Sequence, residues 1–144
     1  MKRRLPVLGL VAGLVGPAAA FADAPAQFKA KFVVPAGNSS SCALVTTVPA
    51  DKRLVIEFVS SLARPLGLSG AATASQLKIV LDGVTVYHEL DQRPVDATSN
   101  ARVSQSLKLT AGAGTLVEFC AGRGNGVDTL NVNVSLAGTL ADVP

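Results

Sequence analysis

Hydrophobic and polar side chains alternate with a period of two along most of the chain. In the segment QFKAKFVV, residues 27–34, Phe28 and Phe32 fall on one face, and lysines occupy the other. The segment TLNVNVSL, residues 129–136, alternates apolar residues with Thr, Asn and Ser in the same way. Because successive side chains of a β-strand point to opposite faces, both segments predict strands with one buried and one solvated face, as in an antiparallel sheet.

Six further segments between these two have the composition of strands: SCALVTTV, KRLVIEFVS, QLKIVL, VTVYHEL, RVSQSLKLT and TLVEFCA. Turn residues separate them, and the sequence has no convincing helical period beyond its N-terminal leader. The pattern therefore predicts an all-β chain that folds as a single antiparallel β-sandwich of about eight strands. Two connectivities stay open at this point, a jelly roll and an immunoglobulin-like arrangement with fewer strands.

The clearest local signal is the hairpin QLKIVLDGVTVYHEL, residues 76–90. Asp82-Gly83 between two strand-like runs is typical of a two-residue type I′ turn. The turn fixes the register, which pairs Leu81 with Val84, Ile79 with Val86 and Leu77 with His88 on one face. We therefore expect an apolar face with the single histidine at its margin.

The first 24 residues, MKRRLPVLGLVAGLVGPAAAFADA, have the three parts of a secretory signal peptide. Lys2, Arg3 and Arg4 precede an apolar run, and Ala20 and Ala22 frame the cleavage site. A Gly-Pro break at residues 16–17 argues against a membrane anchor. We expect a signal peptide at residues 1–22 and one β-sandwich domain at residues 23–144.

Cleavage changes the charge of the protein. Three of the 13 Lys and Arg residues lie in the leader, which leaves ten against ten Asp and Glu. The pI of about 9.1 therefore belongs largely to the leader. A formally neutral domain gives no reason to expect nucleic-acid or anionic-membrane binding, which needs a basic field or stripe.

Two cysteines remain in the exported chain, Cys42 and Cys120. An even pair in an oxidising compartment favours a disulfide, which in the chain-entropy model stabilises a loop of this length by roughly 4 to 5 kcal/mol. The alternative is a Cys120 thiolate nucleophile assisted by Arg123. Because the glycines of GRGNG, residues 122–126, lead into another strand and not into a helix, they are read as turn residues, and the disulfide is the prediction.

His88 is the single histidine of the sequence, and imidazole is the commonest general base and metal ligand in proteins. A metal site needs several ligands at close spacing, and neither a second histidine nor a free cysteine pair is present. No G-x-S-x-G motif occurs either. We therefore predict no catalytic residues and no metal, with His88 at the edge of the core.

Three predicted loops are long enough to carry function. Residues 61–75 contain Leu62, Leu66 and Leu68, which suit a lid on the core or an apolar contact patch. The other two loops, at residues 90–100 and 121–128, hold the candidate loop contacts: Asp91, Arg93, Asp96, Arg123, Asn125 and Asp128. Neither loop has the spacing of a calcium site, so solvated charge is the simpler interpretation of both.

Aromatic residues are scarce, with no tryptophan and one tyrosine. Sugar-binding sandwiches usually stack sugar rings on exposed aromatic side chains, and single-stranded nucleic acids stack their bases in the same way. The composition therefore disfavours both classes of ligand.

The stretches VPADKRLVIEFVSS, residues 48–61, and SLAGTLADVP, residues 135–144, resemble a group of small, uncharacterised, exported bacterial β-sandwich proteins. This resemblance implies a sandwich fold and export. Because no activity is assigned to that group, it lends no catalytic residues to this chain.

We expect an exported, non-enzymatic binding or structural module, without cofactors, that contacts a protein partner or a second copy of itself through loops or a sheet edge. Its expected location is periplasmic or secreted, without a membrane span in the mature chain. Two other hypotheses stay open. One is a small secreted hydrolase in which the carboxylates of residues 90–100 or 121–128 converge on His88, and the other is a carrier with a cavity between the sheets.

Overall fold

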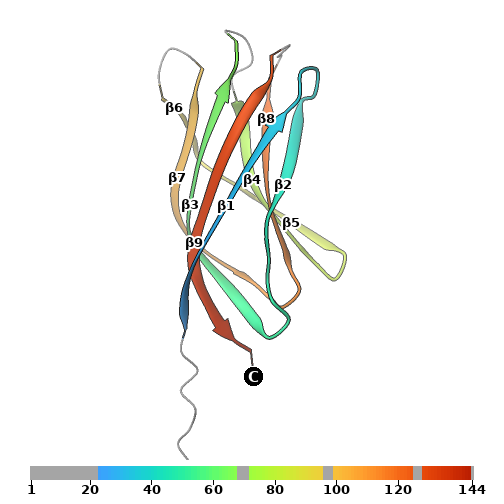
Figure 1. The fold of residues 1–144 in the computed structure, drawn as a ribbon, viewed down its shortest axis with the longest axis vertical. Coiled ribbons are helices and arrows are strands. Elements are labelled where there is room, and N and C mark those ends of the chain that lie inside the picture. Colours follow the sequence, from blue (N-terminus) through green and yellow to red (C-terminus); the bar gives the residue numbers. More distant parts are fainter. Residues whose placement is uncertain (1–22, 68–71, 96–98, 125–127, 144) are drawn as a thin grey trace, which may run out of the picture.

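The computed structural model describes residues 23–67, 72–95, 99–124 and 128–143, and all of its regular elements are β-strands (Figure 1). The predicted leader, residues 1–22, lies outside the described residues. The strands are β1 (Ala24–Val34), β2 (Ser40–Thr47), β3 (Lys52–Pro65), β4 (Ala72–Leu81), β5 (Val84–Glu89), β6 (Gln92–Pro94), β7 (Ala101–Ala111), β8 (Leu116–Arg123) and β9 (Leu130–Asp142). No helix in these described ranges is long and apolar enough to span a membrane.

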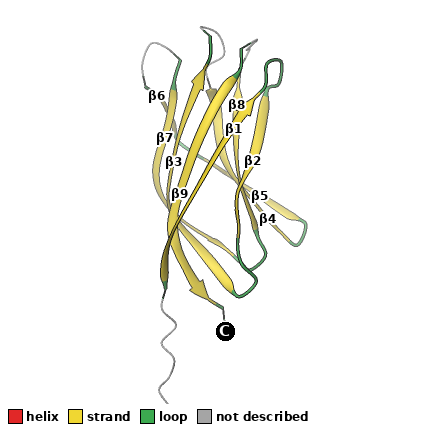
Figure 2. Cartoon of the chain, in the orientation of Figure 1, coloured by secondary structure: helices red, strands yellow, loops and turns green. Residues whose placement is uncertain are grey.

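The strands form two antiparallel sheets, which confirms the predicted sandwich (Figure 2). Sheet A has the order β1-β9-β3-β7-β6, and sheet B has the order β2-β8-β4-β5. If the three-residue β6 is set aside, the first strand pairs with the last, the second with the last but one, and so inward to the β4–β5 hairpin. This nested pairing is the connectivity of a jelly roll.

The core lies between the sheets and is formed by alternate residues of the long strands. In β9 the four predicted core positions, Leu130 to Leu136 in steps of two, are all buried. Phe32 of β1 meets Phe119 of β8 edge to face, with ring centroids 6.3 Å apart, so the two sheets are in contact through their aromatic side chains.

The β4–β5 hairpin has the predicted register, with Leu81 opposite Val84 and His88 opposite Leu77. Asp82 and Gly83 have φ angles of 49° and 79°, as a type I′ turn requires. The expected burial of its apolar face is only partly correct. Leu77 and Ile79 are buried, whereas Leu81, Val84 and Val86 are 39%, 65% and 46% exposed, because the tip of the hairpin projects away from the other strands (Figure 1).

The predicted loop at residues 61–75 is much shorter in the structure. Strand β3 continues to Pro65 and β4 begins at Ala72, because Ser61 and Ala63 continue the alternation with small side chains buried on the inner face. Leu62 is therefore a strand residue, Leu66 is 71% exposed, and Leu68 lies outside the described residues. The sequence predicts that the three leucines form a lid or an apolar patch together. Because Leu62 belongs to strand β3, they do not act as one loop.

One side chain ties the two sheets together at the β6 edge. Ser75 Oγ of β4 donates a hydrogen bond of 2.8 Å to Gln92 Oε1 of β6, and Gln92 Nε2 donates to the Ala72 carbonyl. The segment that the sequence assigns to a loop at residues 90–100 thus begins with a short strand fixed by Gln92.

Candidate functional site

Four pairs of strand ends lie at one end of the sandwich, and the described candidates Arg123 and Asp128 lie beside them. The ends of the strands on either side of the β1–β2, β3–β4, β6–β7 and β8–β9 connections meet at the end opposite the C-terminus (Figure 1). Two backbone hydrogen bonds join them there, since Leu66 N–H donates to the Thr129 carbonyl at 2.9 Å and Arg123 N–H donates to the Ser39 carbonyl at 2.8 Å. This end is held by its own backbone contacts.

Arg123 lies inside the fold and is not the surface contact that the sequence suggested. It is 5% exposed. Its Nε donates to the Asn38 carbonyl at 2.8 Å and its Nη2 donates to the Pro35 carbonyl at 2.5 Å. The guanidinium therefore closes the β1–β2 connection, because it donates to two of its carbonyl groups, of which that of Pro35 also accepts from Asn38 N–H at 3.1 Å.

Among the remaining loop candidates that the structure describes, Asp91 and Arg93 lie together and Asp128 lies elsewhere. Asp91 and Arg93 pair with each other at 3.3 Å, with side chains 69% and 82% exposed, which fits solvated charge. The carboxylate of Asp128 packs against Gly67 and leaves no room there for a Cβ atom. Asp96 and Asn125 lie outside the described residues.

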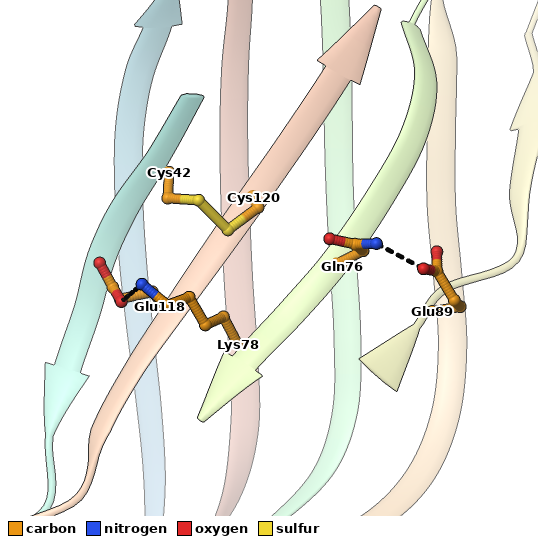
Figure 3. Close-up of a disulfide and its surroundings, with 6 residues drawn as sticks. All are labelled: Cys42, Gln76, Lys78, Glu89, Glu118 and Cys120. Carbon is orange, nitrogen blue, oxygen red and sulfur yellow. Dashed lines mark hydrogen bonds and ion pairs between the residues drawn. A yellow bond between two sulfur atoms is a disulfide. The ribbon is translucent and has the colours of Figure 1, made fainter. Parts of the chain in front are cut away.

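Cys42 and Cys120 form the predicted disulfide, with an S–S distance of 2.05 Å (Figure 3). They face each other across β2 and β8 on the outer face of sheet B. Both cysteines of the chain are consumed in this bond. The alternative of a Cys120 nucleophile is therefore wrong for the oxidised protein.

His88 is distant from the 121–128 segment, one of the two from which the hydrolase hypothesis takes its carboxylates; in the other segment, Asp91 pairs with Arg93. His88 lies in one row with Leu77 and Phe119, and Arg123, where the 121–128 segment leaves β8, is four residues further along that strand. At about 3.3 Å per residue this is roughly 13 Å along the strand direction alone. Within the described residues His88 has no ion pair, and no group of three potential metal ligands occurs. The hydrolase hypothesis gains no support from this arrangement.

The carrier hypothesis requires space between the sheets. That space holds large, fully buried side chains from both sheets, among them Phe119, Leu54, Leu77 and Leu136. Two hollows of about 430 and 590 Å³ instead have linings that come mainly from residues on the outer faces of the sheets. Among the described residues, these two hollows therefore open on the outside of the sandwich.

The four sheet edges differ in how well they are protected against pairing with another strand. Edge strand β1 carries Pro25, Lys29 and Lys31, β6 is three residues long with Arg93 and Pro94, and β2 has a bulge after Leu44. Proline, lysine, bulges and short length are the usual means of blocking an edge. The fourth edge, β5, has the sequence VTVYHE and none of these features.

Strand β5 also exposes apolar side chains on both faces. Val84 and Val86 point to one face, and Tyr87, which is 54% exposed, points to the other. Beside Tyr87, Lys78 Nζ pairs with Glu118 Oε2 at 2.7 Å, and this pairing raises the pKa of Lys78 (Figure 3). Glu89, at the end of β5, accepts a hydrogen bond from Gln76 Nε2. The nearby charged groups are thus paired within the sheet, and the edge itself presents neutral side chains from Val84 to Tyr87.

Sequence reasoning found the β5 strand and missed its exposure. The residues VTVYHE have the composition of a buried strand, and exposure depends on how far the hairpin extends beyond sheet A. The sequence signal of an unprotected edge is the absence of Lys and Pro from this run. This signal can be interpreted only when β5 is known to be an edge strand.

No model of a known protein family matches this chain, and a comparison with curated proteins found no match. Among solved structures, the chain is similar to a protein in the cyanophage Pam1 capsid asymmetric unit, with 17% identity, a TM-score of 0.49, and coverage of 96% of this chain and 100% of that one. It is also similar to a protein in the acidic stable capsid of Helicobacter pylori bacteriophage KHP30, with 15% identity, a TM-score of 0.43, and coverage of 85% and 99%. A third match is dimeric latent PorU from Porphyromonas gingivalis, with 10% identity and a TM-score of 0.42, of which this chain spans 13%. At these identities and TM-scores the matches assign no function.

Proposed function

We propose that this chain is an exported, non-enzymatic interaction module that associates with a second copy of itself through the edge strand β5. One feature carries this proposal: β5 combines an unprotected edge with exposed apolar side chains. Edge strands of this kind are templates for pairing with a strand of another chain, which extends the sheet across the interface.

The geometry of β5 suits a symmetric pair. When two copies are related by a two-fold axis perpendicular to the sheet, side chains that point to one face in the first copy point to the same face in the second. If the axis passes through a residue of β5, each residue lies opposite one that is an even number of positions away in the sequence. With the axis at Val86, Val84 lies opposite His88 of the second copy, Val86 lies opposite its own equivalent, and Thr85 lies opposite Tyr87. No like charges are opposed, and Val84 and Val86 leave water.

Sedimentation equilibrium of the disulfide-bonded protein over a wide concentration range tests the proposal. We expect a reversible monomer–dimer equilibrium that Val86→Lys shifts to monomer, because a lysine on an edge strand blocks pairing. The matched control is Leu44→Lys, at a position 52% exposed on the opposite edge strand of the same sheet. Circular dichroism spectra check that both variants fold.

A monomer at every concentration would overturn self-association. Equal effects of Val86→Lys and Leu44→Lys would also overturn it, because the interface would then not be β5. A dimer that is lost only in Val86→Lys is the expected result.

Export is supported by the leader pattern of residues 1–22 and by the disulfide, which is typical of oxidising compartments. The intact mass of the exported protein after iodoacetamide treatment without reductant tests both. We expect the mass of residues 23–144 less two hydrogens. A mass that includes the leader would contradict export with cleavage. A mass that includes two alkyl groups would contradict oxidation of the two cysteines.

A further inference from the structure

Basic side chains gather on one face of the domain. Lys29, Lys31, Arg64 and Arg102 project from the outer face of sheet A, and each is exposed. None of the four pairs with a carboxylate in the described part of the chain. The described cations that do pair with carboxylates are Lys52, Lys78 and Arg93. Although the domain is formally neutral, this face carries positive charges that pair with no carboxylate of the described residues.

Acidic side chains are scarce on this same face. Among the described residues of the four long strands of sheet A, Glu57 is the one carboxylate that lies outward, and it accepts a hydrogen bond from Thr139 at 3.2 Å. Arg93 lies directly opposite Arg102 across β6 and β7. Like charges opposite each other destabilise an antiparallel pair; Asp91, 3.3 Å from Arg93, offsets part of this repulsion, and an anion bound beside Arg102 would offset more of it.

Small polar side chains form a low floor between the basic residues. One row across the sheet runs from Lys29 of β1 through Ser135 and Ser60 to Ser104 of β7. The next row runs from Lys31 through Asn133 and Leu62 to Arg102. The two rows line a hollow of about 430 Å³ on the outer face of sheet A, which we call the basic groove.

The basic groove is wide and continues along the strands. Its two walls, β1 and β7, are separated by three interstrand spacings of about 4.8 Å, or roughly 14 Å between backbones. A hollow of about 290 Å³ that shares Lys31 and Asn133, and that Phe32 also lines, extends it along β9. Another of about 450 Å³ shares Arg102 and Ser104 at the β6 edge, where the paired Asp91 and Arg93 also line it. An elongated groove of this kind accommodates a chain-like ligand better than a single small ion.

We infer that the basic groove binds an anionic oligosaccharide, a sugar chain that carries carboxylate or sulfate groups. Lys29, Lys31 and Arg102 supply the charge for its acidic groups, and the Arg102 guanidinium matches a carboxylate or sulfate in a bidentate manner. The serine hydroxyls and the Asn133 amide supply donors and acceptors for sugar hydroxyls.

Nucleic acid fits this groove less well. Recognition of single strands relies on aromatic side chains on which bases stack, and among the described residues no aromatic side chain lines the hollow of about 430 Å³. The absence of aromatic residues also argues against neutral sugars held by ring stacking. The groove offers charged, hydroxyl and amide groups beside aliphatic surface such as that of Leu62, and an acidic sugar chain has groups that match each of these.

Isothermal titration calorimetry with the disulfide-bonded protein tests this inference. The probes are a heparin-derived hexasaccharide, a polygalacturonate oligomer of the same length, maltohexaose as the neutral control and a single-stranded oligonucleotide of matched charge. We expect binding of at least one acidic oligosaccharide that weakens as salt is added, and no binding of maltohexaose.

Two pairs of substitutions locate the site. Lys31→Gln with Arg102→Gln should weaken binding of the acidic oligosaccharide by about tenfold or more. Arg53→Gln with Lys108→Gln removes the same charge from exposed positions of β3 and β7, in the same sheet but outside the basic groove, and should have a much smaller effect. Ser60→Leu, which raises the floor and keeps the charge, should also weaken binding.

Three results would overturn the inference. The first is no binding of either acidic oligosaccharide. The second is tighter binding of the oligonucleotide, which would make nucleic acid the ligand. The third is equal loss in the two charge pairs with no effect of Ser60→Leu, which would show diffuse attraction without a shaped site.

Discussion

Gly138 shows how one residue position is fixed by the backbone that crosses it. It lies in β9 opposite Ile56, where a bulge inserts an extra residue into β3. A Cβ atom on Gly138 would lie 2.0 Å from the Val55 carbonyl oxygen and 3.0 Å from its carbon, so part of the β3 backbone would have to move. We expect Gly138→Ala to lower the free energy of unfolding by about 1 to 3 kcal/mol, as other overpacked sites do.

Urea denaturation of Gly138→Ala measures this cost, with Gly112→Ala as the matched control. At Gly112 the nearest atom to a new Cβ is 3.7 Å away, and the glycine has no positive φ. Alanine there should be neutral or slightly stabilising, because it restricts the unfolded chain. Equal midpoints for the two variants would show that β3 adjusts to the new methyl group without cost.

Residue burial was predictable from the sequence where the alternation is regular, and not where a loop residue turns inward. The inner positions of β9 follow from TLNVNVSL alone. Arg123 was taken for a surface residue because GRGNG is typical of a turn. Its partners are carbonyl groups of Pro35 and Asn38, 88 and 85 residues away in sequence, and no local pattern indicates such a contact.

At the scale of elements, the outer face of sheet B joins β4 to β8 through the ion pair between Lys78 and Glu118. Their side chains are 24% and 21% exposed, and the hydrogen bond to Glu118 is the main reason that the pKa of Lys78 lies above 10.5. A pKa raised by folding means that the protonated amine stabilises the folded state. That stabilisation is complete below pH 10.5 and is lost as the pH rises through the higher folded-state pKa.

Glu118→Gln tests this coupling between two strands. The difference in unfolding free energy between the parent protein and Glu118→Gln should be constant from neutral pH to about pH 10 and should shrink above pH 10.5. Urea denaturation at several pH values measures it. Because Lys52, which pairs with Asp142, titrates in the same range in both proteins, its contribution cancels in the difference. A difference that persists well above pH 10.5 would contradict the assignment.

Strand identity and the tight turn at Asp82-Gly83 were also predictable, because both depend on local sequence. The type I′ turn at Asp82-Gly83 and its register follow from two residues and the runs beside them. The length of the hairpin relative to sheet A does not, and that length exposes Val84 and Val86. Edge strand status is likewise a property of the sheet order, which the alternation pattern leaves undetermined.

For the whole molecule, composition predicted neutrality and the fold determines where the charges lie. The jelly-roll order places β1, β9, β3 and β7 side by side, and their outward residues happen to include Lys29, Lys31 and Arg102. The net charge counts the basic residues of this face together with the acidic residues of turns elsewhere in the chain. The basic groove therefore follows from topology, and the argument against anionic ligands based on net charge alone does not hold for this face.

The disulfide gives the last prediction at this scale, because it closes a loop of 78 residues between the second strand and the last but one. Most of the jelly roll lies inside that loop. Cys42→Ala with Cys120→Ala should lower the free energy of unfolding by about 2 to 4 kcal/mol, since the unfolded chain regains the entropy that the bond removes. This range lies below the chain-entropy value of about 4 to 5 kcal/mol because disulfides typically stabilise less than that model predicts. Guanidinium denaturation measures the loss, and the wild-type protein reduced with a phosphine should match the double variant.

Because both cysteines lie on the outer face of sheet B, away from the basic groove, oligosaccharide binding by the folded fraction should be unchanged. A double variant as stable as the oxidised protein would contradict the entropic argument, and a loss of binding in the folded variant would contradict the separation of the two sites.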